Sequence, residues 1–336
     1  MRFTIPFFAA ALLLWSAGCK PEQTAPATEV VIYTSVDQQV AEPILKQFEQ
    51  ASGIKVRIFT DTEATKSAGL AARLMAEKGN PQADVFWGNE VFHTINLARN
   101  GVLAPYASPQ AATIPQQYKD PQNLWAGACL RARVIAVADS VTASVSGIDD
   151  LKSPVLKDRI CLARPTAGTT GGHVSAIYAA WGNDKADAFF RDLHANGAKM
   201  LGGNAVVAEQ IGQGQMLAGL TDNDDVAAAT RAGGALQQVL PDQGEGGLGT
   251  LTIPCTAALV AGRPASDAAK KLIDYLLSAE VEKKLIDNQF GRYSVRATGK
   301  QAVRTMDVSY AKIAENMAWA PNRAAAILEG RKPLEE

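Results

Sequence analysis

The sequence predicts an α/β protein of two lobes, with strands that cross between the lobes. Short apolar runs alternate with amphipathic helical patterns before about residue 102, and the alternation returns between about residues 140 and 234. A strand–helix–strand order favours right-handed crossovers and a parallel sheet that is covered on both faces. A long strand pattern over residues 126–138 separates the two blocks and a return segment follows the second. We therefore expect a cleft where the chain crosses.

The first block predicts three strands whose ends are polar. Strand patterns cover residues 30–34, 54–59 and 84–87, and helical patterns cover residues 40–51 and 67–78. In open α/β sheets, ligands bind beyond the carboxyl ends of the strands. We therefore expect binding residues just after these strands, namely Ser35, Asp37, Thr62, Asn89 and Glu90.

The middle of the chain carries a turn that suits an anion. Arg131 and Arg133 alternate with apolar residues in the strand over 126–138, and a further strand over 158–163 leads into a Gly/Thr-rich turn over 164–172 before a helix over 173–181. Backbone N–H groups at such a helix start favour an anion, so the predicted ligands are Arg133, Thr166, Gly168, Thr169 and Thr170. The Gly-Lys-Ser/Thr ending of a P-loop is missing, and a plain turn with a helix cap is the alternative.

The stretch from Leu217 to Asp225 is the strongest signal for a site. An apolar run ends in three carboxylates within four positions, Asp222, Asp224 and Asp225, and a helical pattern follows over residues 226–232. An aspartate at this point caps a helix, but capping needs only one or two of them. Asp222, Asn223 and Asp224 are therefore predicted ligands for a cationic group of the solute.

The rest of the chain completes the two lobes. Helical patterns cover residues 187–196, 205–213, 266–277, 280–288 and about 310–328, and a strand or strand pair covers residues 248–260. Pro254 interrupts this strand, which indicates an edge or a bend. The predicted first lobe comprises residues 30–133 and 235–290, and the second comprises residues 134–234 and 291–336.

The N-terminus is typical of an exported lipoprotein. An apolar run over residues 3–15, too short to cross a bilayer comfortably, leads to Ser16-Ala17-Gly18-Cys19. We expect a signal peptide over residues 1–18, lipidation of Cys19 and a flexible tether over residues 19–29, with ordinary cleavage nearby as the alternative. The protein would then lie in the periplasm, anchored to a membrane by lipid alone.

Composition and motifs exclude several classes of function. Lys and Arg total 33 against 34 Asp and Glu, which does not suggest nucleic acid as a partner. Three histidines and no Cys-x-x-Cys argue against a zinc site, no cofactor is expected, and no catalytic motif suggests an enzyme. Three cysteines follow Cys19, namely Cys129, Cys161 and Cys255. Cys129 and Cys255 each lie mid-strand, so a disulfide between them and a simple core role both remain open.

With these residues in view, the chain resembles the extracellular solute-binding proteins of bacterial ABC importers, in the branch often described as ferric-iron binding. The markers are the stretches at 33–35, 84–87, 131–134, 164–169 and 268–277. The resemblance implies a monomer with a type II periplasmic-binding-protein fold, which closes by a hinge on a small solute and docks on permease subunits in the inner membrane. In ferric binders of this branch a tyrosine pair holds iron. Asn223-Asp224 stands in its place here, and residues near Asp37 and Asn89 replace the usual His and Glu ligands.

The Gly/Thr-rich turn suits an anion and the aspartate cluster suits a cation. Together they favour a small anionic or zwitterionic solute, for example an aminophosphonate. An anion would meet the turn, and an amine would meet an aspartate. The runner-up is Fe³⁺ with an anion partner, bound through Asp224 and Asp222. A neutral sugar stacked on Trp87 or Trp125 is a third alternative.

Overall fold

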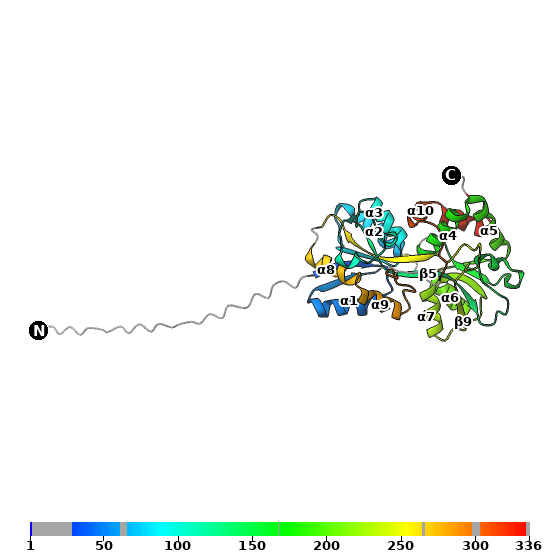
Figure 1. Ribbon diagram of the computed structural model, residues 1–336, viewed down its shortest axis with the longest axis horizontal. Helices are drawn as coiled ribbons and strands as arrows, with labels where there is room; N and C mark the ends of the chain where they lie inside the picture. The colour runs from blue at the N-terminus through cyan, green and yellow to red at the C-terminus, as the bar shows by residue number, and fades with distance from the viewer. Residues whose placement is uncertain (2–28, 61–65, 167, 264–265, 298–302, 334–336) are drawn as a thin grey trace.

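Two α/β lobes lie side by side in the structure, as predicted, and a long strand runs from one into the other (Figure 1). The computed structural model describes residue 1 and residues 29–60, 66–166, 168–263, 266–297 and 303–333. The strand order is β2-β1-β3-β10-β5-β8-β6-β7, with β4 added to β10 and β9 added to β5.

The first lobe is built around three parallel strands. β1 (Glu29–Thr34) lies between β2 (Lys55–Phe59) and β3 (Val85–Gly88), and it pairs in parallel with both. β1 is an almost unbroken apolar run because helices cover both faces of this sheet. The helices and the short strand of this lobe are α1 (Gln38–Ser52), α2 (Lys66–Ala76), α3 (Val91–Arg99), α8 (Asp267–Leu276), α9 (Ala279–Asp287) and β4 (Leu103–Ala104).

The second lobe repeats this arrangement with a different strand order. β6 (Ile160–Ala163) pairs in parallel with β7 (Lys199–Leu201) and with β8 (Ala218–Asp222). Its remaining elements are α4 (Gly168–Trp181), α5 (Asn183–Ala195), α6 (Asn204–Gly212), α7 (Asn223–Arg231), β9 (Leu236–Val239), α10 (Tyr310–Asn316) and α11 (Ala320–Leu328). Short 3-10 turns occur at Glu77–Gly79, Pro109–Ala111, Gln116–Tyr118, Ile148–Lys152 and Pro154–Leu156.

Strands β5 (Ala126–Ala138) and β10 (Thr252–Val260) connect the lobes. The first half of β5 pairs with β10, and from Arg133 onward β5 pairs with β8 and β9 instead. Pro254 lies inside β10, where only β5 is a neighbour, because the pairing with β3 begins at Thr256. The register shifts between Cys255 and Thr256, so the predicted bend is present one residue after the proline.

Three details differ from the sequence-based expectation. Helix α4 begins at Gly168 and not at residue 173, because the Gly/Thr-rich residues that suggested a turn form its first turns. β7 and β9 were not predicted, because they are short and half-exposed and so lack a long apolar run. β9 pairs with the second-lobe half of β5, whereas the predicted boundary at residue 235 assigned it to the first lobe.

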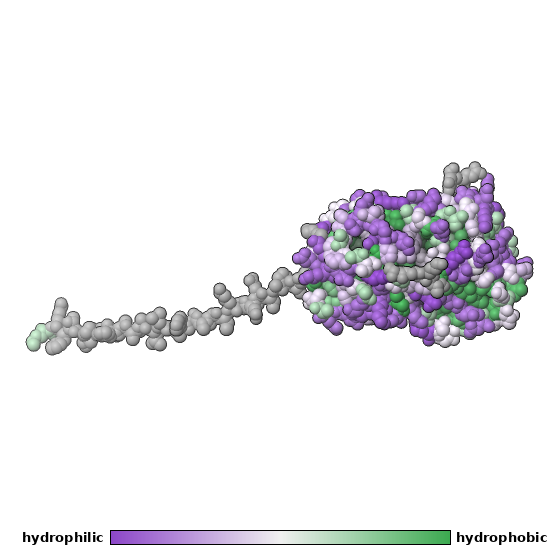
Figure 2. Space-filling view, viewed as in Figure 1, coloured by the Kyte–Doolittle hydropathy of each residue, from purple (hydrophilic) through white to green (hydrophobic). Residues whose placement is uncertain are grey.

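The apolar core joins the lobes on one side of the molecule. One core cluster includes Phe92 of α3, Ile177 of α4 and Ile313 of α10, and α10 contacts both α3 and α4. Separate clusters fill the first lobe around Leu272 and the second lobe around Ile211. Hydrophilic residues predominate on the face seen in Figure 2. Within the described residues, no helix has the length and apolar character needed to span a membrane.

Candidate functional site

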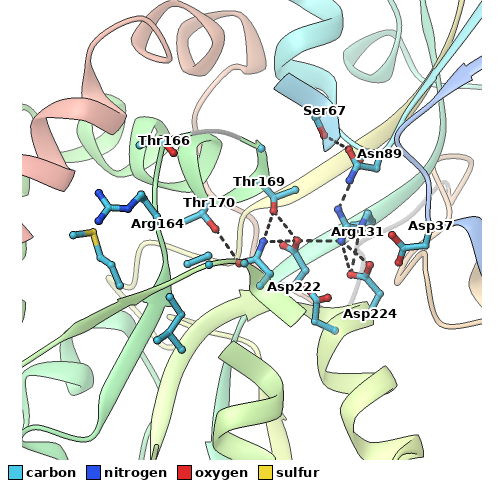
Figure 3. A pocket seen from close by; sticks show the side chains of 18 residues that line it. Asp37, Ser67, Asn89, Arg131, Arg164, Thr166, Thr169, Thr170, Asp222 and Asp224 are labelled. Atoms are coloured by element: carbon cyan, nitrogen blue, oxygen red, sulfur yellow. Dashed lines mark hydrogen bonds and ion pairs between the residues drawn. The ribbon is translucent and has the colours of Figure 1, made fainter. Parts of the chain in front are cut away.

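A polar pocket of about 360 Å³ lies where the two lobes meet β5. Its lining combines side chains from β5, from the strand ends of both lobes and from the first turns of α4 and α6 (Figure 3). The polar and charged lining residues are Asp37, Ser67, Asn89, Arg131, Arg164, Thr166, Thr169, Thr170, Asn204, Asp222, Asp224 and Asp225. A second hollow of about 510 Å³ shares Asp37, Asp224 and Asp225 with this pocket, so the cleft has two adjoining compartments.

Arg131 joins two carboxylates, Asp222 at the end of β8 and Asp224 in the first turn of α7. Its Nη2 atom lies 3.0 Å from Asp222 Oδ2 and 2.6 Å from Asp224 Oδ2, and its side chain is only 4% exposed. The guanidinium also lies over the ring of Phe290, 5.1 Å from its centroid. Figure 3 shows Arg131 between these carboxylates and the backbone of Asn89.

Strand register explains why these charges meet. Arg133 is the Cα partner of Asp222 in the antiparallel pairing of β5 with β8, and Arg133 Nη1 lies 2.7 Å from Asp222 Oδ1. Arg131 is two residues earlier on β5 and therefore projects from the same face. Local sequence does not specify this match, because Asp222 and Arg133 are far apart in the chain.

The pKa values of the three aspartates differ although the residues are neighbours. Burial alone would raise the pKa of Asp222, but Arg131, Arg133 and the Thr169 hydroxyl outweigh it and hold that pKa below its usual value. Burial and the charge of Asp222 raise the pKa of Asp224 to about 6 despite the contact with Arg131. Burial, with Asp224 and Asp222 nearby, raises the pKa of Asp225 well above its ordinary value. The cluster thus has one firmly ionised member and two that hold protons more tightly.

A hydrogen-bonded set extends this cluster to the starts of α4 and α6. The Thr169 hydroxyl donates to Asp222 Oδ2 at 2.6 Å, and Asn204 Nδ2 donates to Thr169 Oγ1 at 2.9 Å. The Thr170 hydroxyl donates to Asn204 Oδ1 at 2.9 Å. The two helix starts are therefore fixed relative to each other and to the end of β8.

The first lobe contributes a smaller group around Asn89. Asn89 Oδ1 accepts hydrogen bonds from the Ser67 hydroxyl at 2.6 Å and from the Ser35 hydroxyl at 3.0 Å. Asp37, the residue before α1, is half-buried and lines both compartments. These groups face the second lobe across the cleft.

Comparison with known proteins identifies the family. The profile of a family described as "Bacterial extracellular solute-binding protein" matches residues 30–290. This chain belongs to that family. It is the solute-binding component of an ABC importer, and the family consists of binding proteins for transport.

Relatives of this solute-binding protein differ in what their names say they bind. A putative 2-aminoethylphosphonate-binding periplasmic protein of Salmonella typhimurium is 24% identical over 278 residues, which cover 82% of this chain and 80% of the relative. The ferric binding protein from Campylobacter jejuni superposes with a TM-score of 0.76 at 24% identity, covering 90% of this chain and 98% of that chain. The periplasmic binding protein AfuA from Actinobacillus pleuropneumoniae, with fructose-6-phosphate bound, has a TM-score of 0.74 at 24% identity, covering 86% and 94%.

These likenesses establish the type II periplasmic-binding-protein fold for this solute-binding protein. They leave its solute open, because the named ligands include a phosphonate, ferric iron and a sugar phosphate.

Most of the predicted binding residues line the pocket. The predicted residues found there are Asp37, Asn89, Thr166, Gly168, Thr169, Thr170, Asp222 and Asp224. Thr62 and the predicted lipidation site Cys19 lie outside the described residues. Asp222 is the residue before α7 but makes no side-chain cap hydrogen bond, so its carboxylate serves the arginine network and not the helix end.

Four predicted ligands have structural roles away from the pocket lining. Ser35 holds Asn89, and its Oγ also accepts the backbone N–H of Asn89 at 2.9 Å. Glu90 caps α3 and accepts the N–H of Phe92 at 2.6 Å. Arg133 is fully buried against Asp222 and is not among the residues that line the pocket. Asn223 accepts the N–H of Ala132 at 2.7 Å and ties α7 to β5.

The structure also corrects the stacking platforms and adds two residues. Trp87 is 0% exposed and Trp125 is 7% exposed, and neither lines the polar pocket, so neither is placed to stack on a sugar there; Trp125 lines a separate hollow beside Tyr118 and Tyr310. Ser67 and Asn204 were missed. The Gly-Gly pair between β7 and α6 was a signal for Asn204, but β7 is short and was not predicted as a strand.

Proposed function

We propose that this solute-binding protein captures a small zwitterion, an organic phosphonate or phosphate that also carries an amine, and delivers it to the permease of its importer. The proposal rests on one observation: a single pocket has two helix N-termini along one side and an excess of carboxylates along another. Its volume of about 360 Å³ suits a small solute.

The anionic group is assigned to the starts of α4 and α6. The first N–H groups of a helix lack intrahelical partners, and the helix dipole places partial positive charge there. Gly203, the residue before α6, has no side chain to cap that helix, and Gly202 and Gly203 both line the pocket. Arg164 is half-exposed at the same side, where its guanidinium forms an ion pair with Glu329 at 2.7 Å and adds positive charge near the helix starts.

The amine is assigned to the carboxylates beyond Arg131. Arg131 and Arg133 bind Asp222 and Asp224, and the lining holds two further carboxyl groups, Asp37 before α1 and Asp225 in the first turn of α7. Both also line the second compartment, which leaves room for the chain that carries the amine. Closure of the first lobe onto the second would bring Asp37 toward the solute. A solute shifts this equilibrium only by its tighter binding to the closed form.

Calorimetry with matched ligands tests the proposal. We expect 2-aminoethylphosphonate to bind at least about tenfold more tightly than ethylphosphonate, because the amine adds a charge-assisted contact worth about 1.5–3 kcal/mol. Equal affinities would remove the amine from the proposal. Binding of ferric citrate with no response to either phosphonate would reverse it in favour of iron.

Ferric iron with an anion partner is the second candidate, and one observation favours it. Carboxylate oxygens of Asp222, Asp224 and Asp225 lie within 4.8 Å of one another, a spacing that suits a hard cation. The guanidinium of Arg131 already contacts two of these residues, however. A unit charge about 4 Å away repels a cation by roughly 4 kcal/mol per charge at the effective dielectric of such sites. No tyrosine is present among the described lining residues.

We also propose that the protein is an exported monomer anchored by a lipid on Cys19. The support is the apolar leader and the Ser-Ala-Gly-Cys sequence of residues 16–19. Mass spectrometry of the mature N-terminus tests this, with Cys19→Ala expected to release the protein from the membrane fraction. A wild-type N-terminus that carries no lipid would contradict the anchor. We expect the bound solute to be recovered chemically unchanged.

A further inference from the structure

Two cysteines face each other across the strands that connect the lobes. Cys129 of β5 and Cys255 of β10 are Cα partners in the antiparallel pairing, and their Sγ atoms lie 3.3 Å apart. Directly opposite residues of an antiparallel pair have Cα atoms about 4.5–5.5 Å apart, which lies within the range of about 4.4–6.8 Å found for disulfides. Bond formation therefore requires the sulfurs to approach, without a change in strand pairing.

The surroundings isolate this pair. Both side chains are 0% exposed, and the register of β10 shifts directly after Cys255. Gly291 packs so closely on Cys129 that an added Cβ would lie 3.0 Å from its Sγ. Cys161 is on β6, which β8 separates from β5 in the sheet, so it is not a competing partner in this register.

We propose that Cys129 and Cys255 are joined by a disulfide in the exported protein, and that this bond ties together the strands by which the chain enters and leaves the second lobe. The residues are 126 positions apart, and the segment between them contains the whole sheet of that lobe, including its half of β5 from Arg133 onward. A crosslink across such a long loop restricts the unfolded chain strongly. The proposal is independent of the identity of the solute.

The oxidation balances as thiol–disulfide exchange. The thiolate of one cysteine attacks a protein disulfide oxidant of the exported compartment and forms a mixed disulfide. The second cysteine then displaces the oxidant, which leaves as a dithiol that carries the two electrons and the two protons given up by the cysteines. Burial raises the pKa of the Cys129 thiol well above its ordinary value, so the folded core disfavours the reactive thiolate. The exchange therefore belongs to the folding chain, before β5 and β10 are covered.

Oxidation would also change one contact next to the pocket. Cys255 Sγ lies 3.7 Å from the backbone oxygen of Asn89, which is within reach of a weak S–H donor. A disulfide sulfur has no hydrogen to donate. The Asn89 carbonyl would then retain Arg131 Nη1, 3.5 Å away, as its side-chain donor. Because neither sulfur lines the pocket, we expect the affinity for solute to change by less than about threefold.

Peptide mapping of the exported full-length chain tests the bond. The protein is denatured without reductant in excess alkylating agent, digested and analysed by mass spectrometry. We expect a linked pair of peptides that contain Cys129 and Cys255 and are two hydrogens lighter than their sum, while Cys161 is alkylated. Recovery of Cys129 and Cys255 as alkylated peptides without prior reduction would overturn the proposal.

Melting temperature tests the structural consequence. Reductant should lower the melting temperature of the wild-type protein by roughly 5–10 °C, given the length of the closed loop. The Cys129→Ala/Cys255→Ala variant should melt lower than the oxidised wild type and show no response to reductant. Cys161→Ala is the matched control and should keep the response. A linked pair whose reduction leaves the melting temperature unchanged would refute the role of the bond in tying the strands.

Discussion

The two sides of the cleft are built differently. On the second-lobe side, Thr169, Asn204, Asp222 and Asp224 are bonded to one another and to arginines of β5, and nearly all of this network is buried. On the first-lobe side, the group consists of Asn89 with its two serine partners and Asp37 at the start of α1.

This difference separates the contributions of the two sides. Buried charges are costly unless they are paired, so the second-lobe network must be complete for the lobe to fold. It therefore holds its geometry before a solute arrives, which lowers the entropic cost of binding. The first-lobe groups lie outside the paired arginine–aspartate network, so we expect them to contribute mainly to affinity upon closure. Variants within the buried second-lobe network should change stability, and substitution of Asp37 should change affinity with little effect on stability.

The largest effect is expected for Arg131→Met. This change leaves Asp222 and Asp224 buried with one fewer cation and should lower the free energy of unfolding by about 3–5 kcal/mol. Urea unfolding measures it. Arg164→Met is the matched control, because Arg164 lines the same pocket, is 50% exposed and should contribute less than about 1 kcal/mol. Similar losses of stability for the two variants would contradict the distinction between the buried network and the exposed part of the pocket lining.

A smaller effect is expected for Thr169→Val. The change removes the hydroxyl that donates to Asp222 and accepts from Asn204, at a cost of about 1–3 kcal/mol for the groups left without partners. Thermal unfolding and calorimetry should both respond, because the start of α4 loses its connection to β8. Thr166→Val, at an exposed position of the same pocket, should leave the melting temperature nearly unchanged. A Thr169→Val protein with an unchanged melting temperature would argue that the network is not needed for folding.

On the first-lobe side, Asp37→Asn should weaken binding of 2-aminoethylphosphonate about tenfold, or about 1.4 kcal/mol. The melting temperature of the solute-free protein should change by less than about 2 °C. Glu42→Gln, on α1 and in the lining of the second compartment only, serves as the control and should have a smaller effect on affinity. A large loss of stability in Asp37→Asn, with affinity intact, would contradict the assignment of this side to closure.

The smallest effect is a pH dependence that arises from Asp224. The pKa of Asp224 is raised to about 6 in the folded protein, so its carboxylate takes up a proton as the pH falls through that value. Loss of this negative charge near the amine should make affinity for an amine-bearing solute decrease severalfold more between pH 7 and pH 5 than affinity for ethylphosphonate does. Calorimetry of the two ligands across this range measures the difference, and Asp224→Asn should abolish it.

The titration of Asp224 affects the stability of the solute-free protein in the direction opposite to its effect on affinity. Because its folded pKa lies above the unfolded value, Asp224 favours the folded state at low pH, and this contribution is lost as the pH rises from about 4 through about 6. Asp222, whose pKa is lowered, favours the folded state above its ordinary pKa and loses that contribution as the pH falls. Comparing the urea unfolding of wild type and Asp224→Asn from pH 4 to pH 8 isolates the contribution of Asp224. A pH profile that the substitution leaves unchanged would contradict it.

Local pattern predicted much of the fold. The long strand over residues 126–138 was predicted with the bounds that β5 has, because its apolar residues form a long run. The start of α4 was misplaced, because Gly and Thr are common in turns and their helical conformation depends on packing. Gly172, for example, lies so close to Phe92 of the first lobe that an added Cβ would be 2.0 Å from the ring. Sequence alone does not reveal that contact.

The sequence by itself determined the alternation of strands and helices, the polar strand ends and the cluster of acids after β8, because these follow from periodicity and composition within short windows. Only the tertiary structure decided what the acids do. The register of β5 against β8 sets Arg133 opposite Asp222, and the pairing of β5 with β10 sets Cys129 opposite Cys255. Such pairings join residues that are distant in the chain, and a shift of one position would turn these side chains to the other face of the sheet.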